Sequence, residues 1–130
     1  MAKRKELGAR GEAVACGHLR EQGWEIETTN FECDFGEIDI VARRHLVDEG
    51  AWLVAFVEVK SRSDGSQVAP ELSVTARKRR TITRVGRYYA KHCGEPGEGY
   101  RFDVIAVDLG EEPPGIEHFE GAFDAQGRPY

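Results

Sequence analysis

The chain has 130 residues, of which 40% are hydrophobic and 32% are charged, and its formal net charge is −5. This length suffices for one core and is too short for two ordinary domains, so we expect a single domain with its core over residues 6–109 and a tail over residues 110–130. No apolar stretch reaches the roughly 20 residues of a membrane-spanning helix, and no apolar signal segment follows the N-terminus, which predicts a cytoplasmic protein without membrane contact.

The predicted elements begin with a helix over residues 5–22, which is rich in good helix formers and is followed by Gly23 as a stop. Short strands are predicted over residues 24–29 and 35–43, with a loop over residues 30–34 between them and a hairpin connection over residues 44–50. Residues 52–60 form the most apolar run of the chain, and the length of this run predicts a central strand buried on both faces.

A polar loop follows the central strand and leads into a long helix predicted over residues 71–92, which Gly94 and Pro96 would end. A strand over residues 100–108 comes next, and the Gly- and Pro-rich tail allows a short edge strand over residues 116–119. This order of elements predicts an α/β fold with one mixed sheet of four to five strands flanked by helices.

Neither the cysteines nor the histidines form a pattern typical of a site. Cys16, Cys33 and Cys93 are odd in number and include no Cys-x-x-Cys pair, which argues against a disulfide framework and against a zinc site. We interpret them as reduced, small apolar residues. The histidines lack metal-ligand spacing such as His-Glu-x-x-His, so no histidine-centred mechanism is predicted.

Three acidic residues and one lysine stand out within the predicted elements. Side chains alternate along a strand, so Glu58 and Lys60 share one face at the end of the apolar run, where each costs desolvation unless it has a partner or a ligand. Asp39 lies between two isoleucines, which by itself is ordinary half-buried alternation. Glu12 is in register with the apolar stripe of the first helix, which we expect to face the sheet.

The elements that carry these residues are expected to meet at one edge of the sheet. Glu12, Asp39 and Glu58 would then supply the oxygen ligands that Mg²⁺ or Mn²⁺ requires. In phosphodiester hydrolysis such a metal lowers the pKa of a bound water and offsets the phosphate charge, while a lysine such as Lys60 orients the water or stabilises the transition state. The alternatives are a solvated strand end and a buried ion-pair network without a function.

Six short motifs are spread along the chain: Gly8-x-x-Gly11-Glu12, Asn30, Gly36-Glu37-Ile38-Asp39, Phe56-Val57-Glu58-Val59-Lys60-Ser61-Arg62, Val74-Thr75-x-x-Lys78 and Arg101-Phe102-Asp103-Val104. On these motifs the chain resembles the bacterial UPF0102 (YraN-like) proteins, from about residue 7 to residue 123. That family is similar to archaeal Holliday junction resolvases. The resemblance therefore implies a restriction-endonuclease-like fold, catalytic positions at Glu12, Asp39, Glu58 and Lys60, and, by analogy with the resolvases, a homodimer. The chain departs from the family pattern at Glu32 and Asp34, in a loop that is usually basic.

The second predicted helix is strongly basic, because seven Lys or Arg residues and no acidic residue lie between Leu72 and Cys93. A solvated helix face usually mixes charges of both signs, so an unmixed stripe favours contact with the phosphates of a nucleic acid. The opposite, apolar side of this helix is expected to carry Ile82, Val85, Tyr89 and Cys93. The expected nucleic-acid-binding residues are Arg77, Lys78, Arg80, Arg84, Arg87 and Lys91.

These observations leave three hypotheses. The leading one is a Mg²⁺- or Mn²⁺-dependent endonuclease that cuts DNA, rather than RNA, at branched or damaged sites. In it, Asp39 and Glu58 hold the metal, Glu12 binds or positions the metal through water, and Lys60 aids the attacking water. The second hypothesis is a non-catalytic nucleic-acid-binding or assembly protein that keeps the nuclease fold. In the third, the charged set is a structural network.

Overall fold

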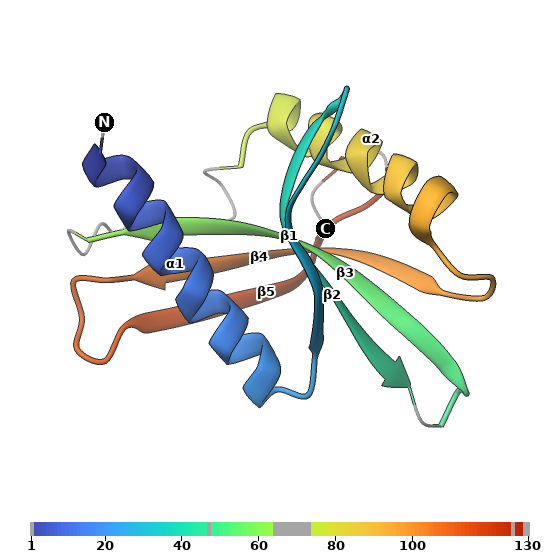
Figure 1. Cartoon of the computed structure of the whole chain (residues 1–130), viewed down its shortest axis with the longest axis horizontal. Coiled ribbons are helices and arrows are strands. Elements are labelled where there is room, and N and C mark those ends of the chain that lie inside the picture. Colours follow the sequence, from blue (N-terminus) through green and yellow to red (C-terminus); the bar gives the residue numbers. More distant parts are fainter. Residues whose placement is uncertain (1, 47, 64–73, 126, 129–130) are drawn as a thin grey trace.

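The computed structural model describes residues 2–46, 48–63, 74–125 and 127–128. In chain order the elements are α1 (Ala2–Glu21), β1 (Glu25–Cys33), β2 (Gly36–Leu46), β3 (Ala51–Arg62), α2 (Ala76–Cys93), β4 (Gly99–Asp108) and β5 (Gly115–Phe123). The strands form one sheet in the order β1-β2-β3-β4-β5, in which β3 and β4 run parallel and the other neighbours run antiparallel. The predicted α/β fold with a mixed sheet and flanking helices is confirmed, and its architecture is consistent with a restriction-endonuclease-like fold (Figure 1).

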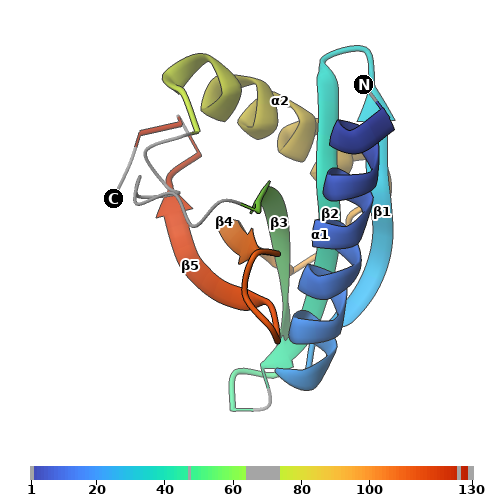
Figure 2. The same cartoon turned by 90° about the vertical axis from the view of Figure 1, so that its left-hand side faces the viewer.

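The two helices cover different faces of the sheet, and each helix buries its own apolar cluster (Figures 1 and 2). On α1, the predicted sheet-facing stripe of Ala15, Cys16 and Leu19 is buried. β3 contributes to both clusters, because Val54 and Phe56 pack on the α2 side while alternate residues pack on the α1 side. The prediction of a central strand buried on both faces is therefore confirmed. Neither helix in the described ranges is long and apolar enough to span a membrane.

The second helix begins later than predicted. Thr75 has extended backbone angles, and its side-chain oxygen accepts a hydrogen bond from the Lys78 N–H at 3.1 Å, so it is the N-cap and Ala76 is the first helical residue. Residues 71–73 of the predicted helix, and residues 64–70 of the predicted loop, lie outside the described residues. Cys93 is exposed rather than apolar-facing, because it is the last residue of α2.

The boundaries of β1, β2 and β5 also differ from the prediction. The predicted loop over residues 30–34 is wrong, because β1 continues to Cys33 and pairs Phe31 with Ile38 of β2. Asn30 allows this continuation at a φ of 53°, since asparagine tolerates the left-handed region better than most residues. β2 extends to Leu46, and the edge strand β5 runs on to Phe123, whose ring is buried in the core.

Gly11 allows α1 to lie close against β3. A Cβ atom at this position would overlap the side chain of Ser61, whose Cβ atom would be 2.8 Å away. We therefore expect Gly11→Ala to lower the free energy of unfolding by about 1 to 2 kcal/mol, although alanine favours helices. Gly17→Ala is the matched control, because nothing lies within 4 Å of a Cβ there, and it should raise stability by about 0.5 to 1 kcal/mol. Urea unfolding of both variants measures the difference, and equal shifts would contradict the close approach.

Candidate functional site

The candidate site lies where β2 separates from β3. The two strands pair from Leu46 opposite Ala51 as far as Ile40 opposite Val57, and the pairing ends there. The Asp39 carboxylate fills the resulting gap, because its Oδ2 accepts a hydrogen bond from the Val59 N–H at 2.8 Å. The alternation of side chains between the two faces of β2 is broken at the same point. Ile38 and Ile40 would share a face in a regular strand, but Ile38 packs in the α2-side cluster and Ile40 in the α1-side cluster. The interpretation of Asp39 as ordinary alternation between isoleucines is therefore wrong.

Three carboxyl groups gather at this separation, from one helix and two strands. Glu58 of β3 is only 5% exposed, and its carboxyl group shares a hydrogen bond with that of Asp39 when one of them is protonated. Burial, followed by the charge of Asp39, raises the pKa of Glu58 to about 7. Partial burial and the charge of Asp39 also raise the pKa of Glu12, which α1 presents from the other side. The three predicted carboxylates are thus brought together, inside the sheet rather than at its edge.

Asn30 and Glu37 complete the site beside the three carboxylates, and neither residue is predicted to have a role there from the sequence. With its amide nitrogen facing the carboxylates, Asn30 donates hydrogen bonds to Glu12 Oε1 and Glu37 Oε1, both at 3.0 Å. Burial and then the charge of Asp39 raise the pKa of Glu37. Asn30 therefore links α1 to the β1–β2 hairpin. Its place in one of the six motifs was the available signal.

Two lysines face this acidic group. Lys78, near the start of α2, has its Nζ 3.7 Å from Glu58 Oε1, and the charges of both Lys78 and Lys60 act to lower the pKa of Glu58. Burial and Asp39 outweigh them, so the pKa still rises. The sequence predicts that Lys78 binds nucleic acid, yet in the structure its ammonium group lies against the carboxylates. The predicted set of Glu12, Asp39, Glu58 and Lys60 thus gains a second cation.

A cleft of about 530 Å³ opens the site to solvent. It is lined by the first turns of α1 together with the ends of β2 and β3: Leu7, Gly8, Ala9, Glu12, Asp39, Val59 and Ser61. Glu12 and Asp39 therefore reach a ligand directly, whereas the buried Glu58 lies behind them. The cleft lies on the side of α1.

The donor set fits a small divalent cation in its chemistry. Asp39 and Glu58 are neighbouring hard oxygen donors, and a cation could replace the proton that the raised pKa of Glu58 favours on that carboxyl group. Within the described ranges, no three His, Cys, Asp or Glu side chains are arranged to hold a metal ion together. Mg²⁺ commonly takes one or two carboxylates and completes its shell with water and phosphate oxygens, so these two carboxylates meet its requirement. Glu12 would act from the outer shell.

The comparisons with known proteins agree with these motifs. The profile of the family described as "Uncharacterised protein family UPF0102" matches residues 11–107. The chain belongs to the UPF0102 family. A UPF0102 protein of Anaeromyxobacter dehalogenans is 41% identical over 126 residues, which cover 97% of this chain and 90% of the relative. A UPF0102 protein of Myxococcus xanthus is 42% identical over 124 residues, which cover 95% and 94%, and one of Moorella thermoacetica is 40% identical over 122 residues, which cover 92% and 97%.

The basic helix of this UPF0102 protein is amphipathic as predicted. Ile82, Val85 and Tyr89 are buried against the sheet. The outer stripe comprises Arg77, Arg80, Arg84, Arg87 and Lys91, which are exposed. Arg87 donates a hydrogen bond to the Ala125 carbonyl at 2.9 Å, and Arg84 lies over the ring of Phe35. These five residues form an exposed positive stripe along α2. Lys78, in the first turn of the same helix, contacts Glu58 of the acidic group.

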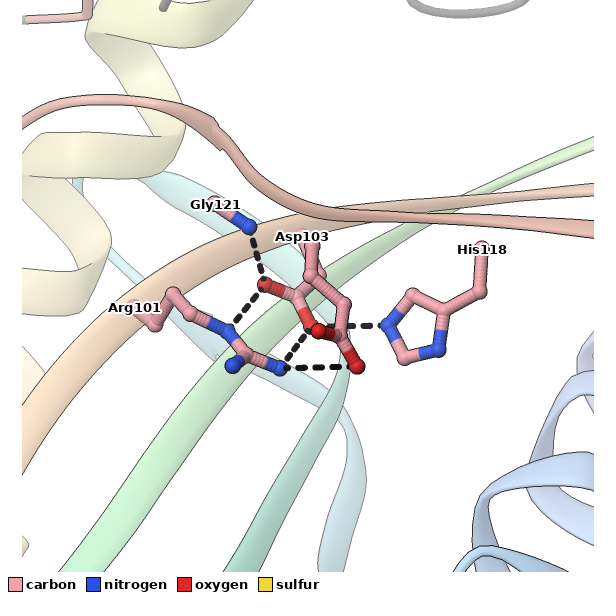
Figure 3. A network of polar contacts seen from close by, with 5 residues as sticks. Arg101, Asp103, His118 and Gly121 are labelled. Carbon is pink, nitrogen blue, oxygen red and sulfur yellow. Dashed lines mark hydrogen bonds and ion pairs between the residues drawn. The ribbon is translucent and has the colours of Figure 1, made fainter.

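A second polar network of the UPF0102 protein lies on β4 and β5, around the buried Asp103 (Figure 3). Arg101 donates from Nε and Nη2 to the two carboxylate oxygens at 2.8 and 2.9 Å, and His118 Nε2 lies 2.8 Å from Oδ2. The Gly121 N–H donates to Oδ1 at 3.0 Å, at a point where the pairing of β4 with β5 shifts register. Asp103 thus holds an irregularity in the edge strand, which gives the Arg101-Phe102-Asp103-Val104 motif a structural role.

This network makes stability depend on the charge of Asp103. Burial would raise the pKa of Asp103, but the hydrogen bonds from His118, Arg101 and the Gly121 N–H outweigh burial and lower it. The stabilisation is therefore present above the unfolded-state pKa of about 3.9 and is lost as the pH falls through the lower folded-state value. We expect Asp103→Asn to cost about 2 kcal/mol at pH 7 in urea unfolding.

Asp108→Asn is the control for this prediction, because Asp108 accepts one hydrogen bond from the Gly110 N–H near the strand end and should lose much less stability. A cost for Asp103→Asn no larger than that of the control would show that the network contributes nothing to stability.

Proposed function

We propose that this UPF0102 protein is a Mg²⁺- or Mn²⁺-dependent DNA endonuclease. The observation that carries the proposal is the gathering of Glu12, Asp39 and Glu58 where β2 separates from β3, with the charge of Lys60 acting on Glu58. Glu12 and Asp39 line the open cleft, and the nearby helix α2 carries no acidic residue. Carboxylates beside a lysine supply what phosphodiester hydrolysis needs, and the basic helix supplies attraction for the substrate.

Each residue has a separate task in this proposal. Asp39 and Glu58 are the residues that would hold the ion, which when bound lowers the pKa of a water and offsets the charge of the phosphate. Lys60 donates to a phosphate oxygen as negative charge accumulates there. Glu12, at the mouth of the cleft, orients the attacking water by accepting a hydrogen bond from it. The basic stripe of α2 holds neighbouring phosphates.

The test is a cleavage assay with purified protein and labelled DNA. Blunt duplex, single strand and four-way junction are each incubated with Mg²⁺, with Mn²⁺ and with a chelator. We expect a product that requires the metal, and a preference for branched DNA over blunt duplex. The absence of a metal-dependent product on all three substrates would refute the endonuclease.

A second candidate function is a nucleic-acid-binding protein without catalysis. It is favoured by the ion pair between Lys78 and Glu58, because this contact already neutralises part of the acidic charge without a metal. It predicts DNA binding that weakens steeply with salt and no cleavage under any metal condition. Measuring the dissociation constant at several salt concentrations, beside the cleavage assay, separates the two functions.

A further inference from the structure

Two neighbouring aromatic side chains are exposed where the β1–β2 hairpin meets α2. Phe35, in the hairpin turn, is 47% exposed, and Tyr88 of α2 is 36% exposed. Their ring centroids are 6.4 Å apart in an edge-on arrangement, and the ring of His92 continues the surface 4.3 Å beyond Tyr88. Scattered exposed apolar residues need no explanation, but adjacent exposed aromatic rings are typical of an interaction site.

The hairpin holds this aromatic pair in a fixed position. Gly36 has a φ of 146°, and a Cβ atom there would lie 2.6 Å from Thr81 Cγ2 of α2, so the hairpin turn is pressed against the helix. Phe31 of β1 packs between Tyr88 and the buried Tyr89, with ring centroids 6.3 and 5.2 Å away. A rigid aromatic surface loses little conformational entropy when a ligand binds to it.

The charges around the pair favour a nucleic acid as the ligand. The Arg84 guanidinium lies 4.7 Å from the centroid of the Phe35 ring, within the basic stripe of α2. Two acidic residues lie in the same hairpin: Glu32 is paired across the strands with Glu37, which has the same charge sign, and Asp34 precedes Phe35 in the turn. The positive charge beside the rings therefore comes from α2. Aromatic rings beside an unmixed row of arginines match a strand that offers both a base and phosphates.

We propose that Phe35 and Tyr88 form a stacking platform for an unpaired base of the bound DNA, in which the base stacks on one ring and contacts the edge of the other, because the two ring planes are 69° apart. This inference rests on the proposed function, because it places the base on the same strand whose phosphates lie along α2. Tyr88 is ten residues beyond Lys78, the residue that contacts Glu58, which is about 15 Å along the helix axis or roughly four base-pair steps of DNA. The preferred substrate is therefore DNA in which paired and unpaired segments meet a few nucleotides from the carboxylates.

The experiment measures binding in a chelator, so that cleavage plays no part. A blunt duplex and a forked duplex of equal nucleotide number are compared by fluorescence anisotropy, using wild type, Phe35→Ala, Tyr88→Ala and Phe35→Trp. We expect each alanine variant to weaken forked-DNA binding by about tenfold and to leave blunt-duplex binding unchanged, since base stacking on an aromatic ring is lost. Phe35→Trp should restore the affinity. Ile116→Ala is the control, because Ile116 is similarly exposed, at 37%, but lies on β5.

A fluorescent base gives a second readout. With 2-aminopurine at the unpaired position of the fork, wild type should quench its fluorescence on binding, and Phe35→Ala should not. Equal losses of affinity on forked and blunt DNA would overturn the platform, because Phe35 would then only position Arg84 for phosphates. Unchanged binding of forked DNA by both alanine variants would also overturn it. If only the cleavage assay fails, the proposed endonuclease activity is refuted, and the binding results still test the stacking platform.

Discussion

Lys60→Ala is expected to reduce metal-dependent DNA cleavage by about a hundredfold or more, because removing one donor that stabilises transition-state charge typically costs this much. Binding of DNA in a chelator should stay within about twofold of wild type, since the basic stripe of α2 is unchanged. The measurement is the single-turnover cleavage rate on junction DNA with saturating protein and Mn²⁺. Single-turnover conditions separate the chemical step from binding and product release.

Lys91→Ala is the matched control for Lys60→Ala, because it also removes one lysine charge but lies in the last turn of α2. It should weaken binding slightly and leave the rate of the bound complex unchanged. Asp39→Asn should lose cleavage as completely as Lys60→Ala, since Asp39 is one of the two proposed metal ligands. Wild-type cleavage rates in both Lys60→Ala and Asp39→Asn would eliminate the proposed site as the source of any nuclease activity.

Glu58→Gln is expected to make the metal-free protein more stable at pH 8, by about 3 kcal/mol. Burial and Asp39 raise the pKa of Glu58 in the folded state to about 7, whereas the unfolded chain has the ordinary value near 4.5. Between these two values the folded state binds a proton that the unfolded state has released, so stability falls as the pH rises from about 4.5 to about 7. The glutamine carries no charge and removes this dependence. Urea unfolding from pH 4.5 to pH 8 measures it.

Glu98→Gln serves as the contrasting control. The Glu98 side chain is also only 5% exposed, but its carboxylate lies 2.8 Å from Arg43, so its loss should destabilise the protein at pH 8. Mg²⁺ should stabilise wild type at pH 8 and have little effect on Glu58→Gln, because a ligand must be deprotonated to bind the metal. A Glu58→Gln variant that is less stable than wild type at pH 8 would contradict the repulsion between Asp39 and Glu58.

Much of the fold could be predicted because hydrophobic period and propensity are local properties. The central strand, the apolar stripe of α1 and the buried side of α2 all follow from alternation or helical spacing, and the structure confirms them. The predicted element boundaries are wrong where a single residue's cap or backbone conformation determines where a helix or strand begins or ends. Thr75 caps α2 and delays its start, and Asn30 adopts a positive φ that lets β1 continue through a predicted loop.

Most residues of the candidate site could be predicted from the sequence, but their arrangement in space could not. Glu12, Asp39 and Glu58 could be selected because each is a carboxylate in an otherwise apolar pattern. The separation of β2 from β3 could not be predicted, since it depends on a side chain replacing a backbone partner. The contact between Lys78 and Glu58 joins residues 20 positions apart across a helix and a strand. The sequence does not reveal this contact, so the charge of Lys78 groups it with the expected nucleic-acid-binding residues instead.

The hydrogen bond from the Val59 N–H to Asp39 has a consequence for genetic studies of the protein. Asp39 closes the gap between two strands as well as belonging to the proposed catalytic set, so its substitution combines a folding defect with a chemical one. A null phenotype of an Asp39 allele would therefore not distinguish absent protein from inactive protein. Lys60 is the better choice for a separation-of-function allele, and steady-state protein level in cells should be compared for the two alleles before any phenotype is assigned to lost catalysis.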